Sequence, residues 1–372
     1  MGPQQTPLQS EIHWFDNAVE ANNGLFMSKQ FQIQQPLLPP GHPPILSSRV
    51  GVLLVNLGTP EATSYWPMRR YLKEFLSDPR VIELNRVLWW FILNLIILSF
   101  RPQKSGHAYE QIWNKDRNES PLKTTTRAQA EAVAEKLGEA VHVDWAMNYG
   151  FPPIYERLQA MKEQGCDRIL VVPLYPQYSA STTASVVDNV GRSLKAMRWQ
   201  PTIRVVPPYF AQASYVNAIA NSLTDYIDQL TWKPDRILMA FHGLPREYLD
   251  KGDPYHCQCQ KTARLVRNKL RLSPDDLEVV FQSRFGKAEW LKPYAQESVE
   301  ELPTQGVKNL LIISPGFAAD CVETLEELAI GLKETFEEQG GKNFAVVPCL
   351  NASRGSINML ETIIRNELQG WV

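Results

Sequence analysis

An internal repeat limits the folds open to this chain more than any other feature of its sequence. Short apolar runs alternate with amphipathic stretches from residue 50 onward, a pattern typical of parallel strands covered by helices. Three segments of the first half recur in the same order in the second half: 52–60 resembles 237–245, 145–150 resembles 281–286, and 165–173 resembles 306–315. Such self-similarity indicates a duplicated unit. The sequence therefore predicts two similar α/β halves that face each other across a cleft.

An additional segment interrupts the first half. The interval from Gly58 to Gly150 is about 45 to 50 residues longer than the equivalent interval from Gly243 to Gly286. It contains the most apolar window of the chain, residues 87–100, which has an Asn within it. A bilayer-spanning helix needs about 20 residues, so we expect no transmembrane helix. Two interpretations remain open: a buried core helix, or an exposed apolar lip that touches an apolar ligand or a membrane surface.

The length of 372 residues is sufficient for two domains with separate cores. We expect an irregular N-terminal extension over 1–48, a first lobe over 49–173, a second lobe over 174–345, and a C-terminal segment over 346–372 that packs back on the first lobe. The formal net charge of −2 gives no reason to expect a nucleic acid partner. Five scattered cysteines without a recognisable secretory signal indicate a reducing compartment.

Candidate chemistry lies at the ends of two predicted strands of the second half. The apolar run 310–313 is followed by Asp320, Glu323 and Glu327, and the two glutamates would share one face of a helix. An ordinary solvated helix face is the alternative interpretation. His242 ends another predicted strand and is followed by glycine, which suits a ring facing a cleft. A histidine and a carboxylate across a common cavity suit proton removal or the transfer of a metal.

The other polar motifs do not predict a particular reaction. The segment 174–183 is rich in hydroxyls and aromatic rings, which suits a binding wall or a capped helix start. Residues 56–60 lack the pattern of a glycine-rich phosphate loop, which argues against a nucleotide. The run 256–259 has one histidine and two cysteines but no second ligand pair, so a structural zinc site is disfavoured. Cys321 is either a soft metal ligand or a small apolar residue.

Several separate motifs, in order, resemble those of one family. They are residues 54–60, 175–183, 241–245, 252–255, 282–284 and 320–327. From about residue 50 to the C-terminus the chain resembles the ferrochelatases, lyases that insert ferrous iron into a porphyrin in the last step of haem synthesis. The resemblance implies two Rossmann-like lobes with parallel four-stranded sheets flanked by helices, a chelatase-like fold. It also implies an apolar lip, at about residues 75–122, over a porphyrin cleft.

The resemblance also implies roles for individual residues. It assigns catalysis to His242 and Glu323, and metal handling to these two together with Glu327. The substrate-binding positions are Arg101, Lys104, Tyr109 and Ser120 for the propionates, with Tyr178 and Trp290 lining the pocket. Which of His242 and Glu323 takes protons and which takes metal stays open. A basic residue that many family members carry is replaced here by Asn148.

The resemblance predicts protoporphyrin IX and Fe²⁺ as substrates, with protohaem as the product. We expect no cofactor and no [2Fe–2S] cluster, because residue 180 is alanine where cluster-bearing relatives have cysteine, and no cysteine follows Cys349. Coproporphyrin III as the substrate, or a non-enzymatic tetrapyrrole-binding role, are the alternatives. We expect a cytoplasmic protein that can contact the inner face of a membrane through residues 87–100. The oligomeric state stays open.

Overall fold

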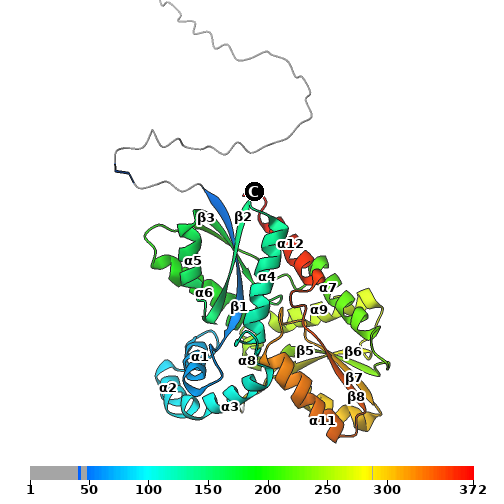
Figure 1. Ribbon diagram of the computed structural model, residues 1–372. Coiled ribbons are helices and arrows are strands. Elements are labelled where there is room, and N and C mark those ends of the chain that lie inside the picture. The colour runs from blue at the N-terminus through cyan, green and yellow to red at the C-terminus, as the bar shows by residue number, and fades with distance from the viewer. Residues whose placement is uncertain (1–40, 43–47, 287) are drawn as a thin grey trace, which may run out of the picture. The chain divides into compact units, whose positions relative to one another are not determined.

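Two parallel four-stranded sheets organise the chain (Figure 1). The computed structural model describes residues 41–42, 48–286 and 288–372, and the expected extension over 1–48 lies almost wholly outside them. Residues 48–372 form one compact unit. The first sheet contains β2 (Val141–Gly150), β1 (Arg49–Thr59), β3 (Cys166–Pro173) and β4 (Thr202–Val205), in that order. The second contains β6 (Leu277–Gln282), β5 (Arg236–His242), β7 (Asn309–Ile313) and β8 (Asn343–Val347).

The duplication extends to the strand order, which is the same in both sheets. Smaller features repeat as well. The N–H of Met147 donates to the carbonyl of Pro152 at 2.7 Å, and in the second half Phe281 donates to Pro293 at 2.8 Å. Near the ends of the equivalent strands β1 and β5, Leu57-Gly58 corresponds to His242-Gly243. The predicted fold class and internal duplication are therefore confirmed.

The predicted boundary between the lobes at 173 and 174 is wrong. The strand β4 pairs with β3, so the first lobe continues beyond residue 200. The strand was missed because it is only four residues long and none of them is fully buried, which leaves no apolar run to recognise.

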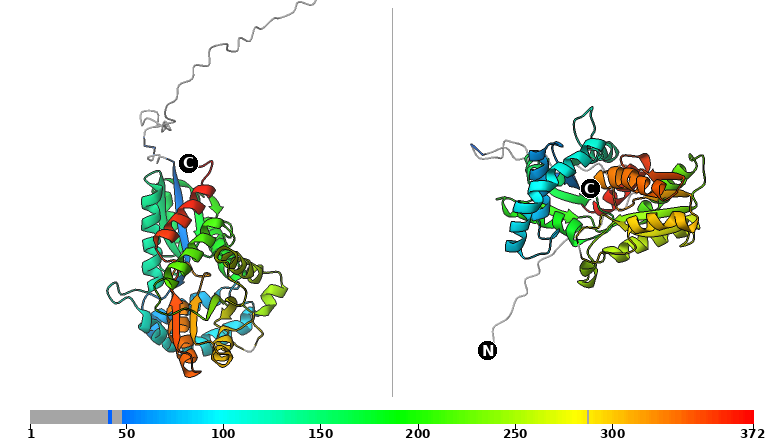
Figure 2. Two further views of the ribbon diagram at one scale, coloured as in Figure 1. Left: turned by 90° about the vertical axis from the view of Figure 1, so that its right-hand side faces the viewer. Right: turned by 90° about the horizontal axis from the view of Figure 1, so that it is seen from below.

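A single apolar core joins the two sheets. It contains the inner faces of both sheets and four helices that lie between them, α4 (Pro121–Leu137), α7 (Ala213–Ile227), α9 (Tyr255–Leu270) and α12 (Arg354–Glu367). The outer face of the first sheet packs on α5 (Ile154–Glu163) and α6 (Ser185–Lys195). The outer face of the second packs on α10 (Ala295–Glu301), η5 (Glu323–Leu332) and α11 (Lys333–Glu338). Figure 2 shows these layers from two further sides.

The C-terminal segment lies against both lobes. Its helix α12 packs on α7 and on α4 of the first lobe. Beyond the helix, the indole of Trp371 lies under the guanidinium of Arg204, 4.1 Å from the ring centroid.

The lip consists of α2 (Arg86–Phe91), η2 (Ile92–Ile97) and α3 (Leu98–Ile112), with α1 (Tyr65–Ser77) packed against it. Trp89, Leu93 and Leu98 are buried in a separate small core. The neighbouring large apolar side chains are more than half exposed: Val87, Leu88, Trp90, Phe91, Leu95, Ile96 and Phe100. Of the two interpretations of residues 87–100, the exposed lip is therefore correct. None of the helices in the described ranges has the length and apolarity required to cross a bilayer.

Gly58 permits the turn at the end of β1. Its φ is +118°, and a Cβ at this position would lie 1.8 Å from the carbonyl oxygen of Tyr149. We expect Gly58→Ala to lower the free energy of unfolding by about 2–4 kcal/mol, because both the backbone conformation and the space exclude a side chain. Urea unfolding monitored by circular dichroism measures the change.

Gly191→Ala provides the matched control for this prediction. Gly191 lies within α6, and a Cβ there would meet no atom within 4 Å. The same substitution at that site should stabilise by up to about 1 kcal/mol, through helix propensity. An equal loss of stability in both variants would contradict the explanation.

Candidate active site

His242 is the last residue of β5 and lies half-buried at its carboxyl end. The following residue must be glycine, because a Cβ at Gly243 would lie 2.7 Å from the carbonyl oxygen of Gln282 and 3.1 Å from the indole of Trp290. The His242 Nδ1 lies 2.6 Å from the carbonyl oxygen of Gly243. A carbonyl only accepts hydrogen bonds, so Nδ1 carries the proton and Nε2 of the neutral ring is left as an acceptor.

Glu323 and Glu327 project from η5, the helix that follows β7. The side-chain amide of Gln282, at the end of β6, donates to the backbone carbonyl oxygen of Glu323 at 2.9 Å. The hydroxyl of Ser283 donates to Glu327 Oε2 at 2.5 Å. The helix is a π-helix rather than an α-helix, a rare form that is frequently found at functional sites.

Glu327 interacts electrostatically with both His242 and Glu323. Burial raises the pKa of the Glu327 carboxyl, while the Ser283 hydrogen bond and the charge of His242 act in the opposite direction. The nearby negative charge of Glu323 raises this pKa further. The described residues contain no group of three or more His, Cys, Asp and Glu side chains arranged to hold a metal ion. Metal handling by His242, Glu323 and Glu327 stays a prediction.

Asp320 lies just before the start of η5, away from the helix face that carries Glu323 and Glu327. Its carboxylate accepts hydrogen bonds from the Asn351 amide at 2.6 Å and the backbone N–H of Cys349 at 3.1 Å. The hydroxyl of Thr324 also donates to it, at 3.1 Å. The carboxylate anchors the loop before Glu323. Its main partner is 31 residues away, so local spacing gave no sign of this role.

The lip helix α3 packs against η5 and carries three of the predicted propionate ligands. Arg101 lies over the ring of Phe285, with its guanidinium carbon 4.8 Å from the centroid, and burial lowers the pKa of the guanidinium. Lys104 is exposed. Tyr109 is buried; burial raises the pKa of its phenol, and the charge of Glu323 adds to the shift.

The remaining predicted ligands lie on other elements. Ser120 is 1 % exposed and caps α4, where its hydroxyl accepts the N–H of Lys123 at 3.2 Å. Tyr178 follows β3 and is half-buried. Trp290 is also half-buried, and its indole nitrogen, itself buried, has no hydrogen-bond partner among the described residues. The substrate contacts of these three residues stay predictions.

Two tyrosines that the sequence did not single out also interact electrostatically with Glu323. Burial raises the pKa of Tyr71 and of Tyr175, and the charge of Glu323 contributes to both shifts. Tyr175 belongs to the hydroxyl-rich segment 174–183 and could have been found there. Tyr71 lies on α1 and had no signal in the sequence.

The cysteines have no shared site in the described structure. Cys257 is exposed, whereas Cys259 is buried in the apolar core on which α9 packs. The two cysteine side chains therefore do not point to one common site. Cys321 is 5 % exposed and packs with Leu122 and Ala319. It therefore acts as a small apolar residue.

Comparison with known proteins decides the family. The ferrochelatase family model matches residues 49–368. The chain belongs to the ferrochelatase family. It is 53 % identical to a ferrochelatase of Rhizobium etli over 338 residues, which cover 90 % of this chain and 98 % of the relative. It is 53 % identical to the ferrochelatase of Agrobacterium fabrum, with the same coverage of both chains. The activity is accordingly a lyase reaction, the insertion of ferrous iron into protoporphyrin for haem synthesis.

Solved structures agree with the fold. SirB from Bacillus subtilis with Fe³⁺ superposes with a TM-score of 0.54 at 12 % identity, covering 87 % of this chain and 97 % of SirB. The sirohydrochlorin chelatase SirB of Bacillus subtilis subspecies spizizenii, in complex with cobalt, gives 0.52 at 12 % identity, with 86 % and 97 % coverage. At this identity the likeness confirms the predicted chelatase-like fold alone.

The raised pKa of Glu327 predicts a pH-dependent stability. A carboxyl whose pKa is higher in the folded protein than its ordinary 4.5 contributes its full stability below pH 4.5 and loses it as the pH rises through the folded value. We expect Glu327→Gln, which is neutral at every pH, to gain stability over the natural protein as the pH rises towards neutrality. Urea unfolding at a series of pH values in metal-free buffer measures the difference.

Glu338→Gln is the control for this experiment. Glu338 is exposed at the end of α11, so its substitution reports the general effect of removing one surface charge. A stability difference for Glu327→Gln that does not change with pH would contradict the prediction.

Proposed function

We propose that His242 is the acceptor of the pyrrole protons and that Glu323 assists it and meets the metal. The observation that carries this assignment is the Nδ1 contact with the carbonyl of Gly243, which leaves Nε2 as the acceptor. Two N–H protons must leave the porphyrin before a divalent metal can enter its plane. One proton passes to Nε2 and the other to a carboxylate, and both then leave to solvent. The net reaction exchanges Fe²⁺ for two protons.

The surroundings of this pair suit a substrate that must be bent. A planar porphyrin hides its nitrogens, so binding energy used to distort the ring exposes them to the metal. Trp290 lies against Gly243, directly beside His242, and offers a rigid aromatic wall. Arg101 and Lys104 on the lip supply positive charge for the two propionates of protoporphyrin IX.

We also propose that the metal is held by few protein groups. Iron must be released into the porphyrin, and one imidazole with one or two carboxylates binds Fe²⁺ less tightly than a cysteine-rich cage. We propose further that the enzyme binds no iron–sulfur cluster. Residue 180 is Ala, and four of the five cysteines are buried while Cys257 is exposed, so the cysteines offer no common ligand set.

Turnover of anaerobic Fe²⁺ and protoporphyrin IX, followed by absorbance, tests the catalytic pair. We expect His242→Ala and Glu323→Gln each to lower kcat by about 10²- to 10⁴-fold, the usual contribution of a proton-transfer group. His107→Ala is the control, because His107 is exposed on α3 and pairs with Glu110. Full turnover by His242→Ala would refute the assignment. Parallel assays with coproporphyrin III measure which porphyrin is preferred.

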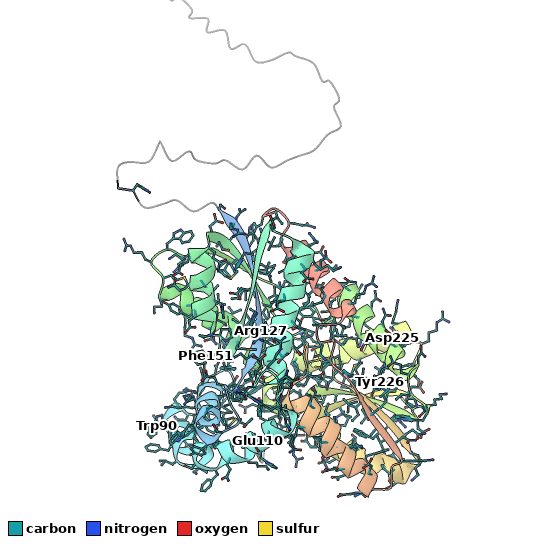
Figure 3. All side chains as sticks on the ribbon, viewed as in Figure 1. Trp90, Glu110, Arg127, Phe151, Asp225 and Tyr226 are labelled. Atoms are coloured by element: carbon teal, nitrogen blue, oxygen red, sulfur yellow. The ribbon has the colours of Figure 1, made fainter. Side chains whose placement is uncertain are left out.

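A second proposal concerns location. We propose a cytoplasmic enzyme whose lip contacts a membrane surface. The exposed apolar side chains of α2 and η2 form one patch, and Trp90 lies at its outer edge, away from both sheets (Figure 3). Exposed patches of this kind mark interaction surfaces. Arg86 at the start of α2 adds a charge that favours anionic headgroups.

Co-sedimentation with vesicles that contain anionic lipid tests the contact. The variant Trp90→Ser, Phe91→Ser, Leu95→Ser, Ile96→Ser should lose at least about 10-fold in binding, since each large side chain contributes roughly 1.5–3 kcal/mol when buried. Trp199→Ser removes an exposed tryptophan outside the lip and should bind as the natural protein does. Equal binding by all three proteins would exclude the lip as the contact.

A further inference from the structure

One carboxylate links the two lobes beside the site. Asp253 lies between α8 (Arg246–Asp250) and α9. Its Oδ2 accepts hydrogen bonds from the Ser179 hydroxyl at 3.0 Å and the N–H of Ala180 at 2.8 Å, both at the start of η3 (Ala180–Ala184) in the first lobe. Its Oδ1 accepts the N–H of Tyr255, the first residue of α9, at 2.9 Å. The carboxylate therefore serves the N-terminal ends of two helical segments, where a negative charge is favourable.

The link continues along α9 as a row of hydrogen bonds. The backbone N–H of Tyr178 donates to Oε1 of Gln258 at 2.7 Å. The side-chain amide of Gln177 donates to the hydroxyl of Thr262 at 3.1 Å. Consecutive residues of the first lobe thus bond to successive turns of one helix of the second lobe. We call this row, from Gln177 to Asp253, the seam.

The seam includes Gln177 and Tyr178, the last two residues of the segment 175–178. On one side it fixes Tyr178 and the residues that precede it, among them Tyr175. Burial raises the pKa of the Tyr175 phenol, and the charge of Glu323 adds to the shift. On the other side Gln177 lies near Gly316, in the loop that follows β7. A Cβ at Gly316 would lie 3.2 Å from the ring of Phe241, the residue before His242, and 3.7 Å from Oε1 of Gln177.

We propose that Asp253 and Gln258 are positioning residues for chelation. They hold the wall formed by residues 175–178 at a fixed separation from His242. The proposal rests on the function assigned to that histidine. Bending a ring between two walls requires their spacing to be fixed, and a displacement of about 1 Å can cost about 10²-fold in rate. An apolar residue at position 253 would leave the N–H groups of Ala180 and Tyr255 without an acceptor, and the two helix starts would separate.

A pair of substitutions at one position provides the main test. Gln258→Glu keeps an oxygen acceptor for the N–H of Tyr178, whereas Gln258→Leu has similar size and no acceptor. We expect Gln258→Leu to lower kcat by about 10-fold or more while the KM for protoporphyrin IX changes less than about 3-fold. Gln258→Glu should retain most of the turnover. Equal kcat in the two variants would overturn the proposal.

Asp253→Ala extends the test with a matched control. We expect the substitution to lower kcat by about 10- to 100-fold. The double variant Asp253→Ala, Ser179→Ala should have nearly the same kcat as Asp253→Ala, because both substitutions remove the same contact. Asp276 also accepts hydrogen bonds from a backbone N–H and a hydroxyl, both of Ser273. It directly precedes β6, so it lies at the amino end of that strand, whereas His242 lies at the carboxyl end of β5. Asp276→Ala should lower the melting temperature without changing kcat. A kcat that follows folded fraction alone in both alanine variants would refute positioning.

The two failures are distinguishable. If His242→Ala retains full turnover, the assigned chemistry is wrong whatever the seam variants do. If His242→Ala is inactive while Gln258→Leu and Asp253→Ala turn over normally, only the positioning role is wrong.

Discussion

The apolar core shared by the two sheets determines where every functional side chain can lie. Four helices and the inner faces of both sheets share one apolar core, so neither sheet can move without exposing apolar surface, at about 25 cal/mol for each Å². The parallel strands therefore present their carboxyl ends to one region. His242 and Glu323 follow two of these strands, and the lip helix α3 reaches the same place by packing on η5.

Polar contacts set the finer geometry within that frame. Buried amides and carboxylates bond across the lobes at several points besides the seam, as when the amide of Gln129 on α4 donates to the carbonyl oxygens of Ala318 and Asn351 at 3.0 and 2.9 Å. Such bonds are directional and are costly to leave unmade once buried. The apolar core brings the lobes together, and the polar bonds restrict them to one alignment.

The repeat was enough to predict the fold class, because it depends on local patterns. The strand-end rule likewise placed His242 at the end of β5 and Glu323 in the helix that follows β7. Features that depend on distant partners were missed or misplaced. The partner of the Asp320 carboxylate, Asn351, lies 31 residues further along the chain, and no local pattern indicates it. The strand β4 has no fully buried residue, so the sequence shows no apolar run from which it could be recognised. The orientation of residues 87–100 follows from packing on Met68 and Tyr71, which periodicity does not reveal.

The equivalent strand ends of the two halves carry side chains of different chemistry. Leu57 and His242 occupy equivalent positions before a glycine in the two halves, yet only one of them can exchange protons. The two copies of the frame therefore place unlike side chains at the same point. A flat substrate lying between these two strand ends would meet an aliphatic side chain on one side and an imidazole on the other.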